Sequence, residues 1–241
     1  MERKGWRRET PKVAFPARFR YLSALRRQTL RSRRHDEILR RRTRQASGRR
    51  RRASGQTLSA FLLRQAARAL RAGGIVAYPT EAVFGLGCDP LDPFATGRLL
   101  ELKGRPVHKG LILVGADYHQ LAPFVTEPDA DRMRRVTGSW PGPHTWVFDA
   151  AADAPWWITG GRNTLAVRVT AHPVAAALCR AFGGAIVSTS ANRAGMAPAR
   201  SPLALRRQLP RGIDLILHGG LGGLRQPTTI QDARTGATIR P

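Results

Sequence analysis

From Thr57 onward, short apolar segments of strand length alternate with segments of helical period, and several connections between them are only a few residues long. Strands that run parallel need a crossover of about a dozen residues or more, and these connections are too short to supply one at every step. The sequence therefore predicts an α/β fold in which helices flank a twisted mixed sheet, rather than a regular doubly wound sheet.

The expected elements follow from the apolar period and from residues that favour the ends of helices and strands. The first helix is expected to begin at Thr57 or Ser59, either of which can cap it, and to end at Gly73-Gly74. Further helices are expected over 92–102, in two short pieces within 117–135, over 173–182 and from 202 onward. Strands are expected over 75–78, 111–114, 146–148, 165–169, 185–188, 215–217 and 229–230, with loops over 80–90 and 104–110.

Charge divides the chain at the same point. Residues 1–56 hold 20 Lys and Arg against 4 Asp and Glu, a net charge of +16, whereas residues 57–241 hold 21 against 12, a net charge of +9. The first segment has few aliphatic residues at helical or strand period, so it could not bury enough surface to offset its ordering entropy. We expect an Arg-rich, disordered extension over 1–56 and a folded domain over 57–241.

Three interpretations of residues 1–56 remain open. Clustered arginine neutralises phosphates, which fits an arm that contacts nucleic acid. An Arg-rich, acid-poor segment also fits a targeting peptide. The third interpretation is an upstream reading frame joined to the true start by a misplaced start codon, since 37 arginines against 4 lysines are typical of a GC-rich genome.

Composition argues against secreted, membrane-spanning and zinc-binding classes of protein. The two cysteines, Cys88 and Cys179, are too few for a disulfide framework and lack the spacing of metal ligands. No apolar run reaches the ~18–20 residues that span a bilayer, and no apolar segment near Met1 has the pattern of a secretory signal. We therefore expect a cytoplasmic protein that contacts no membrane and has no metal site of its own.

The first polar loop follows the expected strand over 75–78. It contains Thr80 and Glu81, and then the stretch Gly85-Leu86-Gly87. A hydroxyl group beside backbone N–H groups at a sheet edge can hold an anion, but the segment lacks the Gly-Lys-Ser/Thr of a Walker A loop. A plain glycine turn is the competing interpretation.

The second polar loop contains Lys103 and Lys109, the only lysines after residue 56 in this arginine-rich chain. A compact ammonium group at two neighbouring places indicates a need that arginine does not meet, such as a point charge on a phosphate. Arg105 lies between them and adds a planar fork that can grip a phosphate or carboxylate with two hydrogen bonds. The alternative is a solvated basic loop.

The third polar segment, Ser188-Thr189-Ser190-Ala191-Asn192, follows directly after a buried strand. Small hydroxyl groups and an amide at the C-terminal end of a strand are typical of a ligand-binding crevice, and a polar turn with local side-chain capping is an equal alternative. Arg168 is a fourth candidate. It lies inside an apolar strand, where a buried charge needs an ionic partner or a ligand.

Five blocks of this sequence resemble the YrdC/TsaC family, the threonylcarbamoyl-AMP synthases. The stretch 74–88 resembles the opening motif of that family, and the stretch 102–112 contains its Lys-x-Arg motif. The stretches 140–145, 165–169 and 188–192 match later blocks in the same order, the last with the family's Ser-x-Asn motif at Ser190 and Asn192. The resemblance covers about residues 57–241. It implies the short, single-domain type of the family, with a basic ligand cavity on a twisted sheet.

The resemblance also implies which residues bind which ligand. Lys103 and Arg105 would carry catalysis and would hold ATP together with Thr145, Ser188, Ser190 and Asn192. L-threonine would be bound by Thr80, Lys109 and Arg168, the last through the carboxylate of the amino acid.

The reaction that the resemblance implies joins L-threonine, bicarbonate and ATP into L-threonylcarbamoyl-adenylate and pyrophosphate. The product would feed the tRNA threonylcarbamoyl-transferase machinery that modifies the adenosine beside the anticodon, and contact with tRNA or another RNA is also expected. Mg²⁺ would arrive with ATP, held mainly by the triphosphate, because acids are scarce in the motif loops.

Two other functions stay open at this point. One is an RNA-binding or ribosome-maturation protein that uses the same basic cavity, which the positive charge permits. The other is a carbamoyl-transfer module related to a hydrogenase-maturation protein, although that protein is far longer and carries zinc-finger cysteines that are absent here.

Overall fold

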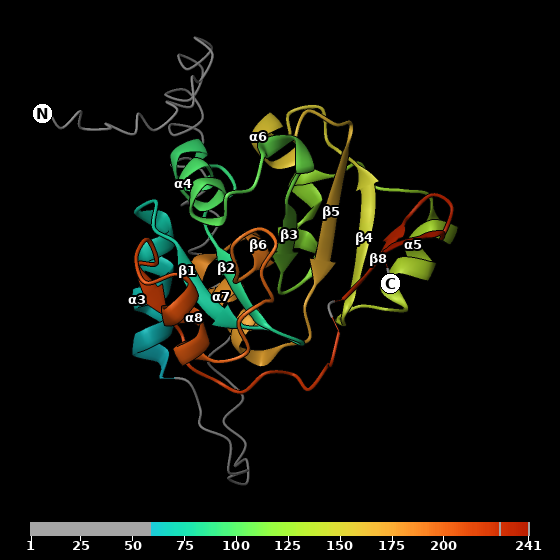
Figure 1. Cartoon of the computed structure of the whole chain (residues 1–241). Coiled ribbons are helices and arrows are strands. Elements are labelled where there is room, and N and C mark those ends of the chain that lie inside the picture. The colour runs from blue at the N-terminus through green and yellow to red at the C-terminus, as the bar shows by residue number, and fades with distance from the viewer. Residues whose placement is uncertain (1–58, 227, 241) are drawn as a thin grey trace, which may run out of the picture. The chain divides into compact units, whose positions relative to one another are not determined.

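The structure is a computed structural model that describes residues 59–226 and 228–240 (Figure 1). The expectations for residues 1–56, and for a helix cap at Thr57, lie outside the described residues. Ser59 is the N-cap of the helix α3 (Ala60–Arg71), and its side chain accepts a hydrogen bond from the backbone N–H of Phe61 at 3.3 Å. The expected first helix is therefore confirmed from Ser59 onward.

Nine strands in the described part of the chain form one mixed sheet. They are β1 (Val76–Pro79), β2 (Phe84–Gly87), β3 (Ile112–Gly115), β4 (His144–Asp149), β5 (Thr164–Val169), β6 (Ile186–Ser190), β7 (Leu215–Ile216), β8 (Thr229–Asp232) and β9 (Thr238–Arg240). Their order across the sheet is β7-β1-β2-β6-β3-β5-β4-β8-β9. The pairs β1–β7, β3–β5 and β4–β8 are parallel and the others are antiparallel, which confirms the predicted mixed sheet.

The remaining elements are helices and single turns of 3₁₀ helix between the strands. The α-helices after α3 are α4 (Pro93–Lys103), α5 (Ala130–Thr137), α6 (Trp156–Thr159), α7 (Pro173–Phe182) and α8 (Pro202–Gln208). The 3₁₀ turns are η2 (Val107–Lys109), η3 (Tyr118–Gln120) and η4 (Ala122–Phe124). Among the helices of the described ranges, none combines the length and the apolar character needed to cross a membrane.

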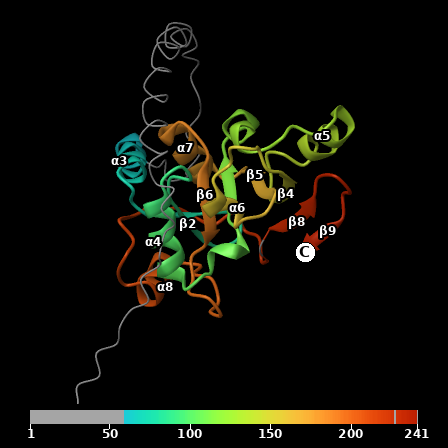
Figure 2. The same ribbon diagram turned by 90° about the horizontal axis from the view of Figure 1, so that it is seen from above.

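The sheet is covered by helices on both faces. Val76 and Tyr78 belong to one buried cluster with side chains of α3 and α7, whereas Ile75 and Ala77 belong to another with side chains of α4 and α8. Neighbouring side chains in a strand point to opposite faces, so this alternation places the two helix pairs on opposite sides of β1. Figure 2 shows α3 and α7 on one side of the strands and α4 and α8 on the other.

The structure corrects the expectation of a loop over 80–90. Residues Phe84–Gly87 form β2, which pairs antiparallel with β1 on one side and with β6 on the other. A Cβ atom on Gly87 would lie 2.7 Å from the carbonyl oxygen of Val187 and 3.0 Å from the ring of Tyr78. The glycine therefore permits close packing in a central strand, and the stretch is neither an anion-binding turn nor a plain glycine turn.

Other differences from the expected elements are smaller. β9 was not expected, and it pairs antiparallel with β8. Two 3₁₀ turns precede α5 within 117–135, and α5 itself runs on to Thr137. α6 was also not expected. It is a single turn that ends at Gly160, which has a φ of 70° in the left-handed region that favours glycine.

Helix α4 carries Lys103 to the end of β6. Asp92 caps the start of the helix by accepting hydrogen bonds from the backbone N–H groups of Phe94 at 2.8 Å and Ala95 at 3.1 Å. Gly104 ends the helix in the left-handed conformation, with a φ of 61°. Lys103 thus lies in the last turn, and its backbone carbonyl accepts a hydrogen bond from Ala194 at 2.8 Å.

A carboxylate fixes the edge of the sheet where β7 joins β1. Asp214 Oδ2 accepts a hydrogen bond from the backbone N–H of Ile75 at 2.7 Å and contacts Arg98 Nη2 at 3.2 Å. We predict that Asp214→Ala lowers the free energy of unfolding by about 1–3 kcal/mol, because a partly buried N–H group is left without its acceptor. Arg98→Ala should lower it by less than about 1 kcal/mol, since that side chain makes an exposed ion pair. Denaturant unfolding of both variants measures the difference, and equal losses of stability would contradict this account.

Candidate active site

A cavity of about 160 Å³ opens at the sheet, lined by residues of β2, β3, β5, β6 and β9 and of loops beside β1, α4, α8 and β8. Five of the candidate residues line it, namely Thr80, Arg105, Arg168, Ser188 and Ser190. Thr228 and Arg240 line it as well, although the sequence did not single them out. Three of the lining residues are arginines, and none of the lining residues in the described ranges is acidic.

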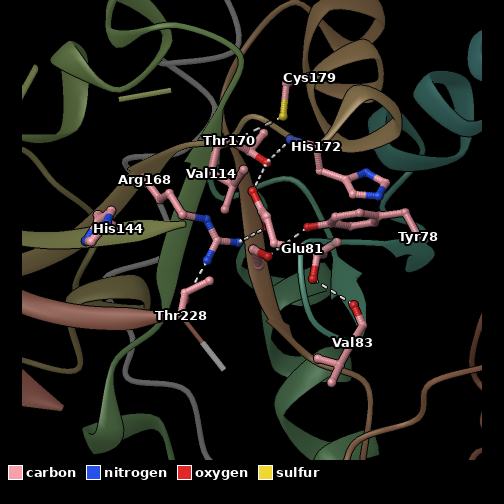
Figure 3. A network of polar contacts seen from close by, with 12 residues as sticks. Tyr78, Glu81, Val83, Val114, His144, Arg168, Thr170, His172, Cys179 and Thr228 are labelled. Atoms are coloured by element: carbon pink, nitrogen blue, oxygen red, sulfur yellow. Dashed lines mark hydrogen bonds and ion pairs between the residues drawn. The ribbon is translucent and has the colours of Figure 1, made fainter. Parts of the chain in front are cut away.

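Arg168 lies in β5 and forms a buried ion pair behind the cavity wall. Its Nη2 atom is 3.5 Å from Glu81 Oε2, and the two side chains are only 7% and 8% exposed. Figure 3 shows Glu81 between Arg168 and Thr170. The sequence predicted that a charge buried in this strand has an ionic partner or a ligand, and the structure shows the ionic partner, Glu81, whose role the sequence had not assigned.

Hydroxyl groups complete the surroundings of the pair. Thr170 Oγ1 donates a hydrogen bond to Glu81 Oε1 at 2.5 Å, and Arg168 Nη1 donates to Thr228 Oγ1 at 2.7 Å. Arg168 Nε is buried and has no hydrogen-bond partner among the described residues. Arg168 also lines the cavity, and not all of its five N–H bonds are used by Glu81 and Thr228, so a carboxylate ligand would suit this side chain.

Two further hydroxyl groups of the cavity are oriented by their own hydrogen bonds. The Tyr78 hydroxyl donates to Ser188 Oγ at 2.9 Å, and burial raises the pKa of Tyr78 well above its ordinary value, so the phenol remains a donor. Ser188 can then direct its own hydrogen to another acceptor. Thr80 Oγ1 donates to the carbonyl oxygen of Val83 at 2.7 Å, so its oxygen remains available as an acceptor.

Lys103 is buried, and oxygen atoms from the end of β6 surround its ammonium group. Nζ donates to the carbonyl oxygen of Ser190, to that of Asn192 at 2.9 Å and to Asn192 Oδ1 at 3.4 Å. Burial lowers the pKa of Lys103 to about 8, and the positive charge of Arg105 acts in the same direction. Asn192 Oδ1 also accepts a hydrogen bond from Ser190 Oγ at 2.7 Å, so the Ser-x-Asn segment and Lys103 form one polar unit.

Arg105 reaches the cavity from the loop after α4. Its Nη2 atom donates to the carbonyl oxygen of Gly110 at 3.0 Å and to that of Lys109 at 3.4 Å, while Nε is buried without a partner among the described residues. Burial lowers the pKa of Arg105 below its ordinary value, and the nearby charges of Arg162 and Arg240 act in the same direction. An anion in the cavity would stabilise the charged guanidinium group and so offset both its burial and the repulsion from the nearby cations.

Four candidate residues do not line the cavity. Lys103 and Asn192 lie behind Ser190, in the polar unit described above. Thr145 is fully buried in β4, and its Oγ1 atom has no hydrogen-bond partner in the described part of the chain. Lys109 is exposed at the end of η2, and the structure does not place it at the cavity wall.

The three residues that sequence reasoning missed differ in how they could have been found. Because Arg168 lies in an apolar strand, an acidic partner could be expected, and Glu81 is an acid in the first motif loop. No pattern in the sequence shows that these two residues pair. Thr228 and Arg240 lie near the C-terminal end of the chain and carried no signal of their own.

Comparison with known proteins identifies relatives of this chain. A family model that is named for Sua5, YciO and YrdC and is described as "Telomere recombination" matches residues 68–241. A protein of Halorhodospira halophila named threonylcarbamoyl-AMP synthase is 57% identical over 180 residues, which are 75% of this chain and 94% of that protein. A protein of the same name from Alkalilimnicola ehrlichii is 56% identical over 188 residues, which are 77% of this chain and 98% of that protein.

Solved structures share the fold. P. abyssi Sua5 in complex with L-threonine superposes with a TM-score of 0.70 at 34% identity, over 73% of this chain and 52% of that one. E. coli YciO superposes with a TM-score of 0.69 at 28% identity, over 77% of this chain and 91% of that one. The chain therefore spans about half the length of P. abyssi Sua5 and most of YciO.

The ammonium group of Lys103 gives the site a testable dependence on pH. With a pKa of about 8, Lys103 is charged below that pH and becomes neutral above it. We predict that ATP affinity falls as the pH rises through about 8, because only the ammonium form attracts phosphate. Lys103→Met should weaken ATP binding by about tenfold or more at pH 7 and remove the fall near pH 8.

Titration calorimetry between pH 6.5 and 9 measures these affinities. Arg64→Met, which removes an exposed charge from α3, is the matched control and should bind ATP as the wild type does. A Lys103→Met variant with wild-type affinity at every pH would show that Lys103 does not contact the nucleotide.

Proposed function

The chain belongs to the family named for Sua5, YciO and YrdC, and from this membership we propose that it is a threonylcarbamoyl-AMP synthase. It would convert L-threonine, bicarbonate and ATP into L-threonylcarbamoyl-adenylate and pyrophosphate. The observation that carries the proposal is the convergence of four motif blocks on one arginine-lined cavity. The two relatives of that name described above are 57% and 56% identical to the chain over stretches that make up 94% and 98% of their own length.

The chemistry needs positioned cations more than it needs a covalent nucleophile. The amine of threonine and bicarbonate give a carbamate with loss of water. A carbamate oxygen then attacks the α-phosphorus of ATP, and the bond from that phosphorus to the oxygen of the leaving pyrophosphate breaks. Negative charge gathers on the phosphate oxygens in the transition state, where fixed donors stabilise it.

The proposed ligand assignments divide the cavity between its two substrates. Threonine would be held by Arg168 through its carboxylate, with Thr80 and Lys109 as further contacts. The nucleotide and its phosphates would be held by Lys103, Arg105, Thr145, Ser188, Ser190 and Asn192. Lys103 and Arg105 would stabilise the developing negative charge.

Phosphate binding at Lys103 requires an exchange of partners. An ammonium group has three N–H donors, and all three already face oxygen atoms of Ser190 and Asn192. Asn192 Oδ1 is the most distant of these acceptors, at 3.4 Å, and it has a second donor in Ser190 Oγ. A phosphate oxygen would therefore replace Asn192 Oδ1 at the lysine.

We further propose that Mg²⁺ enters with ATP and is held mainly by the triphosphate. Within residues 59–226 and 228–240, no three His, Cys, Asp or Glu side chains lie together as a group that could hold a metal ion. The donors that line the cavity are arginine N–H groups and hydroxyl groups, and these suit phosphate oxygens rather than Mg²⁺. When bound, the ion would neutralise part of the charge of the phosphates.

The proposal extends to the setting of the reaction. The adenylate would pass in the cytoplasm to the tRNA threonylcarbamoyl-transferase machinery, which modifies the adenosine beside the anticodon. Contact of the chain with tRNA or another RNA is proposed on the net charge of +9 in residues 57–241. Residues 57–241 are proposed as the catalytic domain, with residues 1–56 as an extension to it.

Pyrophosphate release tests the proposed reaction. We predict release that requires threonine, bicarbonate and ATP together. Serine should be a poor but detectable substrate, because one methyl group is worth only ~1–3 kcal/mol in a fitted pocket. Valine should react more slowly still, because its methyl group cannot donate a hydrogen bond to Thr80. Release that continues without threonine or without bicarbonate would overturn the proposal.

A shortened chain tests the proposed domain division. We predict that a chain beginning at Thr57 keeps its thermal stability and its threonine-, bicarbonate- and ATP-dependent pyrophosphate release, because every proposed ligand residue is retained. RNA affinity should fall. Its dependence on salt should also become shallower: the magnitude of the slope of log affinity against log salt concentration should drop by ~0.7–0.9 for each RNA phosphate that residues 1–56 neutralise. A shortened chain that binds ATP but is inactive would show that the domain boundary is misplaced.

A further inference from the structure

Glu81 is a buried acid that the reaction itself does not use. Among the residues that the structure describes, the buried side chains that carry a formal charge are Glu81, Lys103 and Arg168. Glu81 does not line the cavity, whereas its partner Arg168 does. Because the Glu81 carboxylate is buried beside Arg168 and does not face the cavity, it could affect a ligand only through the position of Arg168.

A chain of hydrogen bonds holds the Glu81 carboxylate from behind. The backbone N–H of His172 donates to Thr170 Oγ1 at 3.1 Å, and Thr170 Oγ1 donates to Glu81 Oε1 at 2.5 Å. The other oxygen, Oε2, has no hydrogen bond in the described part of the chain, and it faces Arg168 Nη2 at 3.5 Å. Figure 3 shows this row of side chains from His172 to Thr228.

The backbone of Glu81 is fixed as well. The backbone N–H of Leu224 donates to the Glu81 carbonyl oxygen at 3.0 Å, and that of Gly222 donates to the Thr80 carbonyl oxygen at 3.0 Å. A Cβ atom on Gly222 would lie 2.8 Å from the Glu81 Cα atom, so the two segments are in close contact. Neither the backbone nor the carboxylate of Glu81 can shift without breaking these contacts.

This arrangement determines which donors Arg168 has left for a ligand. Its guanidinium group carries five N–H bonds, of which one is used on Thr228 and one faces Glu81. The Nε–H is buried and has no partner among the described residues, so the N–H bonds that remain for a ligand are one on Nη1 and one on Nη2. The Glu81 charge holds one side of the guanidinium group, and the side chain also lines the cavity.

We propose that Glu81 is a positioning residue, which anchors the Arg168 guanidinium so that it receives the carboxylate of the amino-acid substrate. This inference rests on the proposed function, since it assumes that Arg168 binds that carboxylate. Glu81 would then contribute to the selection of an amino acid over its amide, although it does not touch the substrate. A purely structural role would affect stability and the binding of both substrates alike.

The test compares L-threonine with L-threoninamide, which lacks the carboxylate charge. Titration calorimetry with ATP present and bicarbonate removed gives the affinity of each without carbamate formation. We expect the preference for threonine over its amide to fall at least about tenfold in Glu81→Gln, with ATP affinity unchanged. Thr170→Val keeps both charges of the pair and removes only the hydrogen bond to Glu81, so it should reduce the preference in the same direction by less.

The chain offers a matched control for the ion pair. Arg234 and Asp149 also lie 3.5 Å apart, but their side chains are 49% and 46% exposed. Asp149→Asn should leave the preference for threonine unchanged. A second check uses Arg168→Met, in which Glu81→Gln should no longer weaken threonine binding, because the positioned group is gone.

The outcomes separate this inference from the proposed function. A wild-type preference in Arg168→Met, or no binding of threonine by the wild type, would overturn the proposed threonine site and this inference with it. If Arg168→Met loses the preference for threonine but Glu81→Gln and Thr170→Val both keep it, only the role of Glu81 is overturned. If Glu81→Gln does not fold, Thr170→Val decides: a wild-type preference in it overturns the inference, and a reduced preference supports it.

Discussion

The buried ion pair between Arg168 and Glu81 is the interaction on which the site depends. Each charge would be strongly unfavourable alone at 7% or 8% exposure, because removal from water costs several kcal/mol per ion. The pair is therefore surrounded by groups that compensate it, with Thr170 behind the carboxylate and Thr228 beside the guanidinium. Arg168 lies in β5 and Thr170 directly follows it. Glu81 follows β1, near the start of the domain, and Thr228 precedes β8, near its end. The ion pair and its hydrogen bonds thus connect segments that are far apart in the sequence.

The same electrostatics make the cavity incomplete without an anion. Glu81 neutralises Arg168, but Lys103 has only backbone and amide oxygens as partners. Burial lowers the pKa of Lys103 and of Arg105, because both cations are partly removed from water. A bound carboxylate or polyphosphate would supply negative charge there, and its binding would then stabilise the folded state.

The sequence predicted well what depends on neighbouring residues. Asp92 and Gly104 mark the ends of α4, and the apolar run at 165–169 marks β5, because caps and strand patterns are read from adjacent positions. It predicted poorly what depends on distant contacts. The Gly-rich stretch of β2 lies close against Tyr78 and Val187 in the sheet, and Arg168 is paired with an acid 87 positions away. Such pairings arise when the sheet forms and leave no local pattern.

Among the site signals that the sequence carried without a resemblance, the rare use of lysine is the one that the structure explains by shape. The structure supplies a reason for it at Lys103. Three oxygen atoms from Ser190 and Asn192 surround Nζ, and an ammonium group with three donors on a slender stem fits them. A planar guanidinium group is wider and presents its donors in a fixed fork, so it could not enter the same space without moving the end of β6. Lys109 is exposed, and no comparable constraint applies to it in the described structure. The residue type at Lys103 is therefore set by the shape of the oxygen cluster as much as by charge.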